Sequence, residues 1–89
     1  MRIKDGFVLR EIAGQIMVIA TGEASKNFHG MIKLNETGRD IFVALQEKCS
    51  EEEIVARLQE KYEIVFEKAA EDTKAFLKQM KDAGFLADE

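Results

Sequence analysis

A few side chains in this sequence are of types that do chemistry, but their surroundings favour structural roles. His29, the only histidine, lies between Phe28 and Gly30 in a predicted loop. A general base would need an orienting partner and a nucleophile beside it. Cys49 is the only cysteine, and a reactive thiolate needs a cation held against it. We therefore expect an exposed loop histidine and a buried structural thiol.

The acidic and glycine-containing stretches do not predict a cofactor site. Glu51, Glu52 and Glu53 could hold a cation, but the positive end of a helix dipole accounts for all three. Gly22 and Gly30 lack the lysine and hydroxyl partners of a phosphate loop. A structural zinc site normally draws four ligands from Cys, His and carboxylates, and this chain has one Cys and one His. We expect no catalysis, no metal and no cofactor.

A row of lysines in the last third of the chain suggests binding instead. Lys74, Lys78 and Lys81 recur at spacings of four and three, which aligns them along one edge of a helix. They flank the apolar positions Ala70, Leu77 and Met80. A groove with an apolar floor and a basic rim would suit an acidic, amphipathic peptide. The alternative is a solvated face on which Lys78 pairs with Asp82.

The short apolar segment Met31–Leu34 is a second candidate for binding. At a sheet edge, such a strand has unpaired N–H and C=O groups to which a partner peptide can add as a further strand. Met31 and Ile32 would offer pockets for alternate side chains of that peptide. The alternative is a protected edge that binds nothing, with Lys33 as the protecting charge.

Composition limits the classes of protein that remain. The 89 residues suffice for one domain, which we expect to span 1–89, and 46% of them are hydrophobic. The net charge of −4 lacks the basic balance of most nucleic-acid binders. No stretch reaches the roughly 20 apolar residues of a membrane span. Because the first six residues are too polar for a secretory signal, we expect a cytoplasmic protein.

The first part of the chain is predicted to form strands. Residues 7–12 and 15–20 are rich in β-branched and aromatic residues, and Ala13-Gly14 between them predicts a hairpin. The second run is apolar on both faces, so we expect this strand to be well covered. A loop should follow over 21–30, then a short third strand over 31–34.

Three helices should complete the chain. Asn35 is a good N-cap for the first, whose apolar stripe ends at Cys49. Ser50 and Glu53 form a capping box at the start of the second. The third should run from about 66 to 83, without a capping side chain at its start, before Gly84 ends it and 85–86 fold back onto the core. The predicted class is α+β, winged-helix-like, with three short antiparallel strands followed by three helices.

Several segments together resemble the PqqD family, named for protein D of pyrroloquinoline-quinone biosynthesis. Residues 33–38, Lys-Leu-Asn-Glu-Thr-Gly, closely resemble that family's K-L-N-E-T-[AG] motif. The opening hairpin, the helix that starts at Ser50, Asp72, Phe76-Leu77 and the ending Gly84-Phe85-Leu86 are also similar to it. The resemblance covers residues 7–86, from the first predicted strand to near the end of the chain.

This resemblance implies a non-catalytic peptide chaperone. Family members bind the leader part of a ribosomally made precursor peptide against the third strand and third helix. They present the core part to a modifying enzyme, commonly a radical S-adenosylmethionine enzyme. In this chain the accepting strand would be Met31, Ile32, Lys33 and Leu34, and the facing helix would contribute from Thr73, Lys74, Leu77, Lys78 and Lys81. Asn35 and Gly38 would fix the turn from strand to helix.

Two other hypotheses are compatible with the sequence. A winged-helix architecture is also compatible with a DNA-binding regulator, although Glu51, Glu52 and Glu53 at the start of the second helix argue against one. An exposed sheet edge could also pair with a second copy of the chain or exchange strands with it, giving a homodimer.

Overall fold

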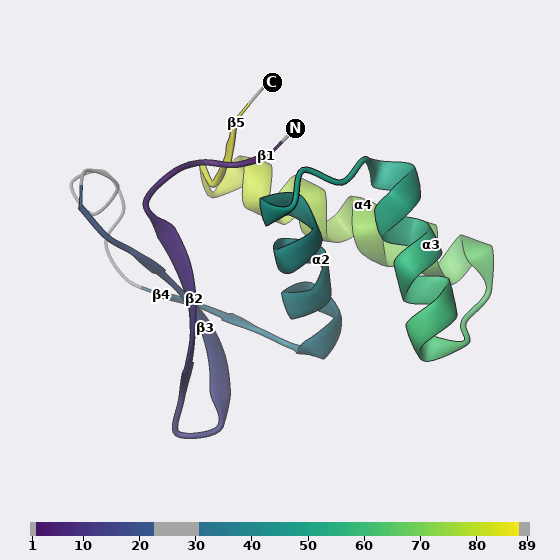
Figure 1. Ribbon diagram of the computed structural model, residues 1–89, viewed down its shortest axis with the longest axis horizontal. Helices are drawn as coiled ribbons and strands as arrows, with labels where there is room; N and C mark the ends of the chain where they lie inside the picture. The colour runs from purple at the N-terminus through teal and green to yellow at the C-terminus, as the bar shows by residue number, and fades with distance from the viewer. Residues whose placement is uncertain (1, 23–30, 88–89) are drawn as a thin grey trace.

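A computed structural model describes residues 2–22 and 31–87, and His29 therefore lies outside the described residues. Within the described residues the main sheet contains β2 (Phe7–Ile12), β3 (Gln15–Ala20) and β4 (Met31–Leu34). The helices are α2 (Glu36–Gln46), α3 (Glu51–Tyr62) and α4 (Phe66–Asp82) (Figure 1). Three antiparallel strands followed by three helices confirm the predicted α+β class.

The sheet has the order β2-β3-β4, and Figure 1 shows the β2–β3 hairpin projecting away from the helices. Its turn residues Ala13 and Gly14 have φ of 52° and 79°, as the positive values of a type I′ turn require. Leu9, Val18 and Leu34 lie on the sheet face that packs on the helical core. β3 is less well covered than predicted. Only Val18 of that strand is buried, because the core packs against one face.

Local capping explains where the helices begin. The Asn35 side chain accepts a hydrogen bond from the Gly38 N–H at 2.7 Å. Ser50 and Glu53 make both bonds of the predicted capping box, at 3.2 and 2.9 Å. The N-cap of α4 is Val65, which makes no side-chain capping bond, as predicted. α2 is shorter than its apolar stripe suggested and ends at Gln46, so Cys49 lies beyond the helix.

The two ends of the described chain meet, which the sequence pattern did not reveal. β1 (Arg2–Ile3) pairs antiparallel with β5 (Leu86–Ala87). The Lys4 N–H donates to the Phe85 carbonyl at 2.8 Å. The Phe85 ring is fully buried and lies 4.2 Å from that of Phe7, centroid to centroid. The return of residues 85–86 onto the core is thereby confirmed, with an added strand pair that closes it.

None of the described helices is long and apolar enough to cross a membrane.

Candidate functional site

β4 forms one edge of the sheet. One side of β4 pairs with β3, so that Met31 lies opposite Ile19 and Leu34 lies opposite Ile16. Among residues 2–22 and 31–87, no strand pairs with its other side. Leu34 is buried in the core, whereas the Lys33 side chain is exposed. The fold therefore provides the free strand margin that peptide addition requires.

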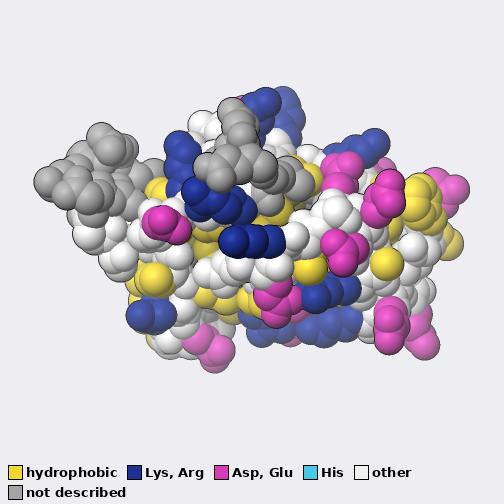
Figure 2. Space-filling model, turned by 45° about the horizontal axis from the view of Figure 1, so that its top comes forward, with side chains coloured by type: hydrophobic (Ala, Val, Ile, Leu, Met, Phe, Trp, Pro, Cys, Tyr) yellow, Lys and Arg dark blue, Asp and Glu magenta, His cyan; other side chains and the backbone are white. Residues whose placement is uncertain are grey.

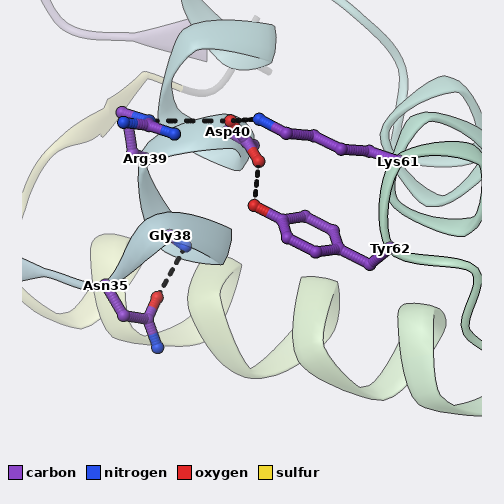
Figure 3. Close-up of polar contacts among 6 residues, drawn as sticks. All are labelled: Asn35, Gly38, Arg39, Asp40, Lys61 and Tyr62. Carbon is purple, nitrogen blue, oxygen red and sulfur yellow. Dashed lines mark hydrogen bonds and ion pairs between the residues drawn. The ribbon is translucent and has the colours of Figure 1, made fainter.

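Three elements converge where β4 ends. A Cβ atom placed on Gly38 would lie 3.1 Å from Cε2 of Phe76 in α4, 3.2 Å from Oδ1 of Asn35 and 3.5 Å from Cβ of Leu34. That same Asn35 oxygen accepts the Gly38 N–H (Figure 3). Gly38 is thus required by close approach: it lets α2 begin directly after β4 while Phe76 lies against its first turn.

A hollow of about 320 Å³ adjoins this junction, and we call it the α2/α4 hollow. Its α2 side is lined by Asn35, Thr37, Gly38 and Ile41, and its α4 side by Lys68, Asp72, Ala75, Phe76 and Gln79. Lys68 and Asp72 are ion-paired at 3.1 Å, and the hydrogen bond and charge of Asp72 raise the pKa of Lys68. Asn35 directly follows β4, so the hollow begins where that strand ends.

The predicted α4 residues do not line this hollow. Thr73 is 0% and Leu77 is 9% exposed, so both fill the core and offer a peptide little surface. Lys74 instead lines a hollow between α3 and α4. Lys78 and Lys81 are exposed and follow Lys74 along the same edge of the helix. Of the predicted residues, the structure brings only the β4 strand to the α2/α4 side.

Periodicity could not distinguish the two flanks of α4. It identifies the buried stripe, but polar residues border that stripe on both sides: Lys68, Asp72 and Gln79 on one, Lys74, Lys78 and Lys81 on the other. The flank nearest β4 is decided by where α3 packs, which is a tertiary contact. Asp72 and Phe76, two positions at which the chain resembles the family, both line the α2/α4 hollow.

The buried position of Thr73 leads to a stability prediction. Its hydroxyl oxygen has no hydrogen-bond partner among the described residues. We expect Thr73→Val to raise the free energy of unfolding by about 1 kcal/mol, because it removes an unsatisfied buried hydroxyl and keeps the β-branched shape. Urea denaturation measures the change. Thr21→Val is the control, since the exposed Thr21 hydroxyl donates to the Gly6 carbonyl at 3.0 Å. A destabilised Thr73→Val protein would contradict the prediction.

A polar cluster on the opposite side of α2 ties that helix to the end of α3 (Figure 3). Asp40 accepts hydrogen bonds from the Tyr62 hydroxyl and, at 3.0 Å, from the Lys61 ammonium. Burial alone would raise the pKa of Asp40, but these hydrogen bonds and the charges of Lys61 and Arg39 outweigh it and lower the pKa. Burial, followed by the bond to Asp40, raises the pKa of Tyr62 to about 12. The cluster is a structural clamp between α2 and α3.

This clamp predicts an alkaline weakening of the fold. Because the folded pKa of Tyr62 exceeds the usual value of about 10, its contribution is complete below pH 10 and is lost as the pH rises toward 12. Tyr62 is the only tyrosine and the chain has no tryptophan, so tyrosinate absorbance reports this group alone. We expect Tyr62→Phe to lower the free energy of unfolding at neutral pH by about 1.5 kcal/mol. An absorbance midpoint near 10 would refute the clamp.

The groups that could do chemistry do not converge. Cys49 is free and 8% exposed, as expected of a structural thiol. Within the part of the chain that the structure describes, no three His, Cys, Asp or Glu residues are grouped as metal ligands. The sheet margin and the α2/α4 hollow therefore carry the candidate site.

Comparison with known proteins identifies the fold and the family of this chain. A search of the curated proteins gave no match. Among solved structures, TbiB1 in complex with the TbiA(beta) leader peptide has a TM-score of 0.77 and 22% identity, covering 99% of this chain and 100% of that one. Lasso peptide synthetase B1 complexed with the leader peptide has a TM-score of 0.77 and 17% identity, covering 98% and 96%. At these identities the likeness establishes the fold. The family model of coenzyme PQQ synthesis protein D matches residues 15–86, and the chain belongs to this PqqD family.

Proposed function

We propose that this chain is a non-catalytic peptide chaperone that binds the leader of a ribosomally made precursor peptide by strand addition to β4. The observation that carries the proposal is the margin of β4 that no other described strand occupies, with the α2/α4 hollow beginning where this strand ends. Family membership supports it, and both similar solved structures are complexes with a leader peptide. Residues 1–89 would act as one recognition domain.

Strand addition divides the binding between backbone and side chains. The outward N–H and C=O groups of β4 would supply main-chain hydrogen bonds to any extended peptide. Sequence choice would come from the α2/α4 hollow, where Phe76 and Ile41 give apolar contact and Thr37 and Gln79 give polar contact. Because Lys68 and Asp72 neutralise one another, this hollow does not demand an acidic leader. The acidic peptide suggested by the lysine row is therefore replaced by an extended, partly apolar one.

The partner that receives the peptide is inferred from the family resemblance. A leader held along β4 leaves the core part of the precursor free for a modifying enzyme, for which a radical S-adenosylmethionine enzyme is our proposal. A homodimer through β4 would compete with the leader for the same backbone groups. We therefore propose that the leader-binding form is monomeric at its sheet edge.

The DNA-binding alternative gains no support, since Glu51, Glu52 and Glu53 occupy the first turn of α3.

Titration of the ¹⁵N-labelled chain with the leader of the precursor encoded beside its gene tests this function. We expect amide shifts in Met31–Leu34 and in the α4 residues of the α2/α4 hollow, Ala75 and Gln79. Leader binding should also dissociate any dimer held through β4. Shifts confined to the β2 edge or to α3 would reject the assignment, and a low-salt gel shift with DNA would favour the regulator.

A further inference from the structure

A larger hollow lies on the other flank of α4. It has a volume of about 470 Å³ and is formed between α3 and α4, and we call it the α3/α4 groove. Its walls are Val55, Ala56 and Gln59 from α3 and Phe66, Ala70 and Lys74 from α4, with Glu51 and Glu52 also lining it. The α2/α4 hollow lies on the opposite flank of the same helix, and the two hollows share no lining residue.

The groove is bordered by hydrophobic side chains that the fold leaves uncovered. Val65 is 66% and Phe66 is 59% exposed, the two most exposed large hydrophobic residues of the described chain. They start α4 at an N-terminus without a side-chain cap, so neither local structure nor the core explains them. Adjacent exposed hydrophobic residues beside an apolar groove are typical of a docking surface.

The stretch of chain that contributes most of the groove is acidic. Residues 51–72 contain eight acidic and three basic side chains, while the rest of the chain has nine acidic and ten basic. The three basic side chains are already in ion pairs: Arg57 with Glu47 at 2.6 Å, Lys61 with Asp40 at 3.0 Å and Lys68 with Asp72 at 3.1 Å. Glu60, Glu63 and Glu67 form no ion pair within the described residues. Figure 2 shows acidic and hydrophobic side chains together at the end of the molecule made by α3 and the start of α4 (right). Among the charged residues that line the groove itself, Glu51 and Glu52 are acidic and Lys74 is basic.

We propose that the α3/α4 groove docks a basic, amphipathic helix of a partner protein. Its apolar face would contact Phe66 and Ala70, and its cations would face Glu51 and Glu52, which line the groove and form no ion pair within the described residues. A second copy of this chain is a poor occupant, because it would bring two acidic faces together. Since the leader site is on the other flank of α4, the partner and the leader can bind at once. Only this last statement rests on the proposed function, and it makes α4 the wall between peptide and receiving protein.

A synthetic peptide probes this surface directly. The probe is a helix of about 14 residues, roughly 21 Å long, with leucines on one face and lysines on the other. We expect it to produce saturable amide shifts in Val55, Gln59, Phe66 and Ala70 of the ¹⁵N-labelled chain and none in β4. Ala56→Trp, which fills the groove, and Phe66→Ser, which removes its exposed ring, should each weaken binding roughly tenfold or more. Ile12→Ser removes another exposed hydrophobic residue, at the hairpin, and should leave binding unchanged.

Three results would overturn the inference. Equal binding of a peptide with the same composition but scattered leucines would show attraction by charge alone. Tighter binding of a peptide that has glutamates in place of the lysines would show that the groove prefers an acidic partner. Sedimentation could show that the unsubstituted chain is a dimer and that the Ala56→Trp protein is a monomer. A second copy of the chain would then occupy the groove. Binding of the leader peptide is measured separately. If the Ala56→Trp protein still binds the leader but no longer binds the basic helix, the two surfaces are independent. If the unsubstituted chain does not bind the leader, only the proposed function is rejected.

Discussion

We expect Ala75→Trp to reduce the affinity for the leader peptide roughly 100-fold, which corresponds to about 2.8 kcal/mol of binding free energy. Ala75 is an exposed residue of α4 that lines the α2/α4 hollow. An indole at this position would occupy the space that a leader side chain needs beside β4, and a filled pocket acts by steric exclusion. Isothermal titration calorimetry with the leader measures the loss.

The matched control is Ala56→Trp on the neighbouring helix. Ala56 is also exposed, but it lines the α3/α4 groove on the other flank of α4. The two variants therefore add the same side chain to two hollows of one molecule. Both should keep the free energy of unfolding within about 0.5 kcal/mol of the parent, since surface substitutions seldom change it more. Equal leader affinity in the two variants would place the leader somewhere other than beside β4 and α4.

The largest stability effect that we expect at the site is that of Gly38→Val, a loss of about 3 kcal/mol in the free energy of unfolding. A Cβ at this position already lies 3.1 Å from the Phe76 ring and 3.2 Å from the capping oxygen of Asn35. Two further methyl groups must displace one of them. Displacing Asn35 costs the cap of α2, and displacing Phe76 opens the contact between α2 and α4. Urea denaturation measures the change.

Gly38→Ala and Thr37→Val separate crowding from helix propensity. Alanine gains the helical preference of roughly 0.5–1 kcal/mol over glycine, which partly offsets the tight Cβ contacts, so its loss should stay below about 1 kcal/mol. Thr37→Val adds no atom near Phe76 and exchanges one β-branched residue for another, so it should be nearly neutral. If Gly38→Val and Thr37→Val changed the free energy of unfolding by the same small amount, the close approach of α2 to α4 would not be needed for folding.

Much of the architecture was determined by local chemistry. Gly14 favours the hairpin because glycine adopts the positive φ of the turn without a steric cost, and Ala13 adopts a positive φ beside it. Asn35, Ser50 and Glu53 specify two helix starts because each satisfies a free N–H with its side chain. The motif at 33–38 located the strand-to-helix junction, and the structure explains its glycine by the approach of Phe76. These features depend on neighbours in sequence, so they could be predicted.

The details of the binding surface were decided only by tertiary structure. Periodicity marked the buried stripe of α4, which includes Thr73 and Leu77, but could not tell which polar flank of that helix lies nearer β4. The same limit applies to β3, whose apolar residues face both ways although the helices cover one face. The pairing of β1 with β5 joins residues more than 80 positions apart. Which faces meet is set by how whole elements pack, and no short stretch of sequence contains that information.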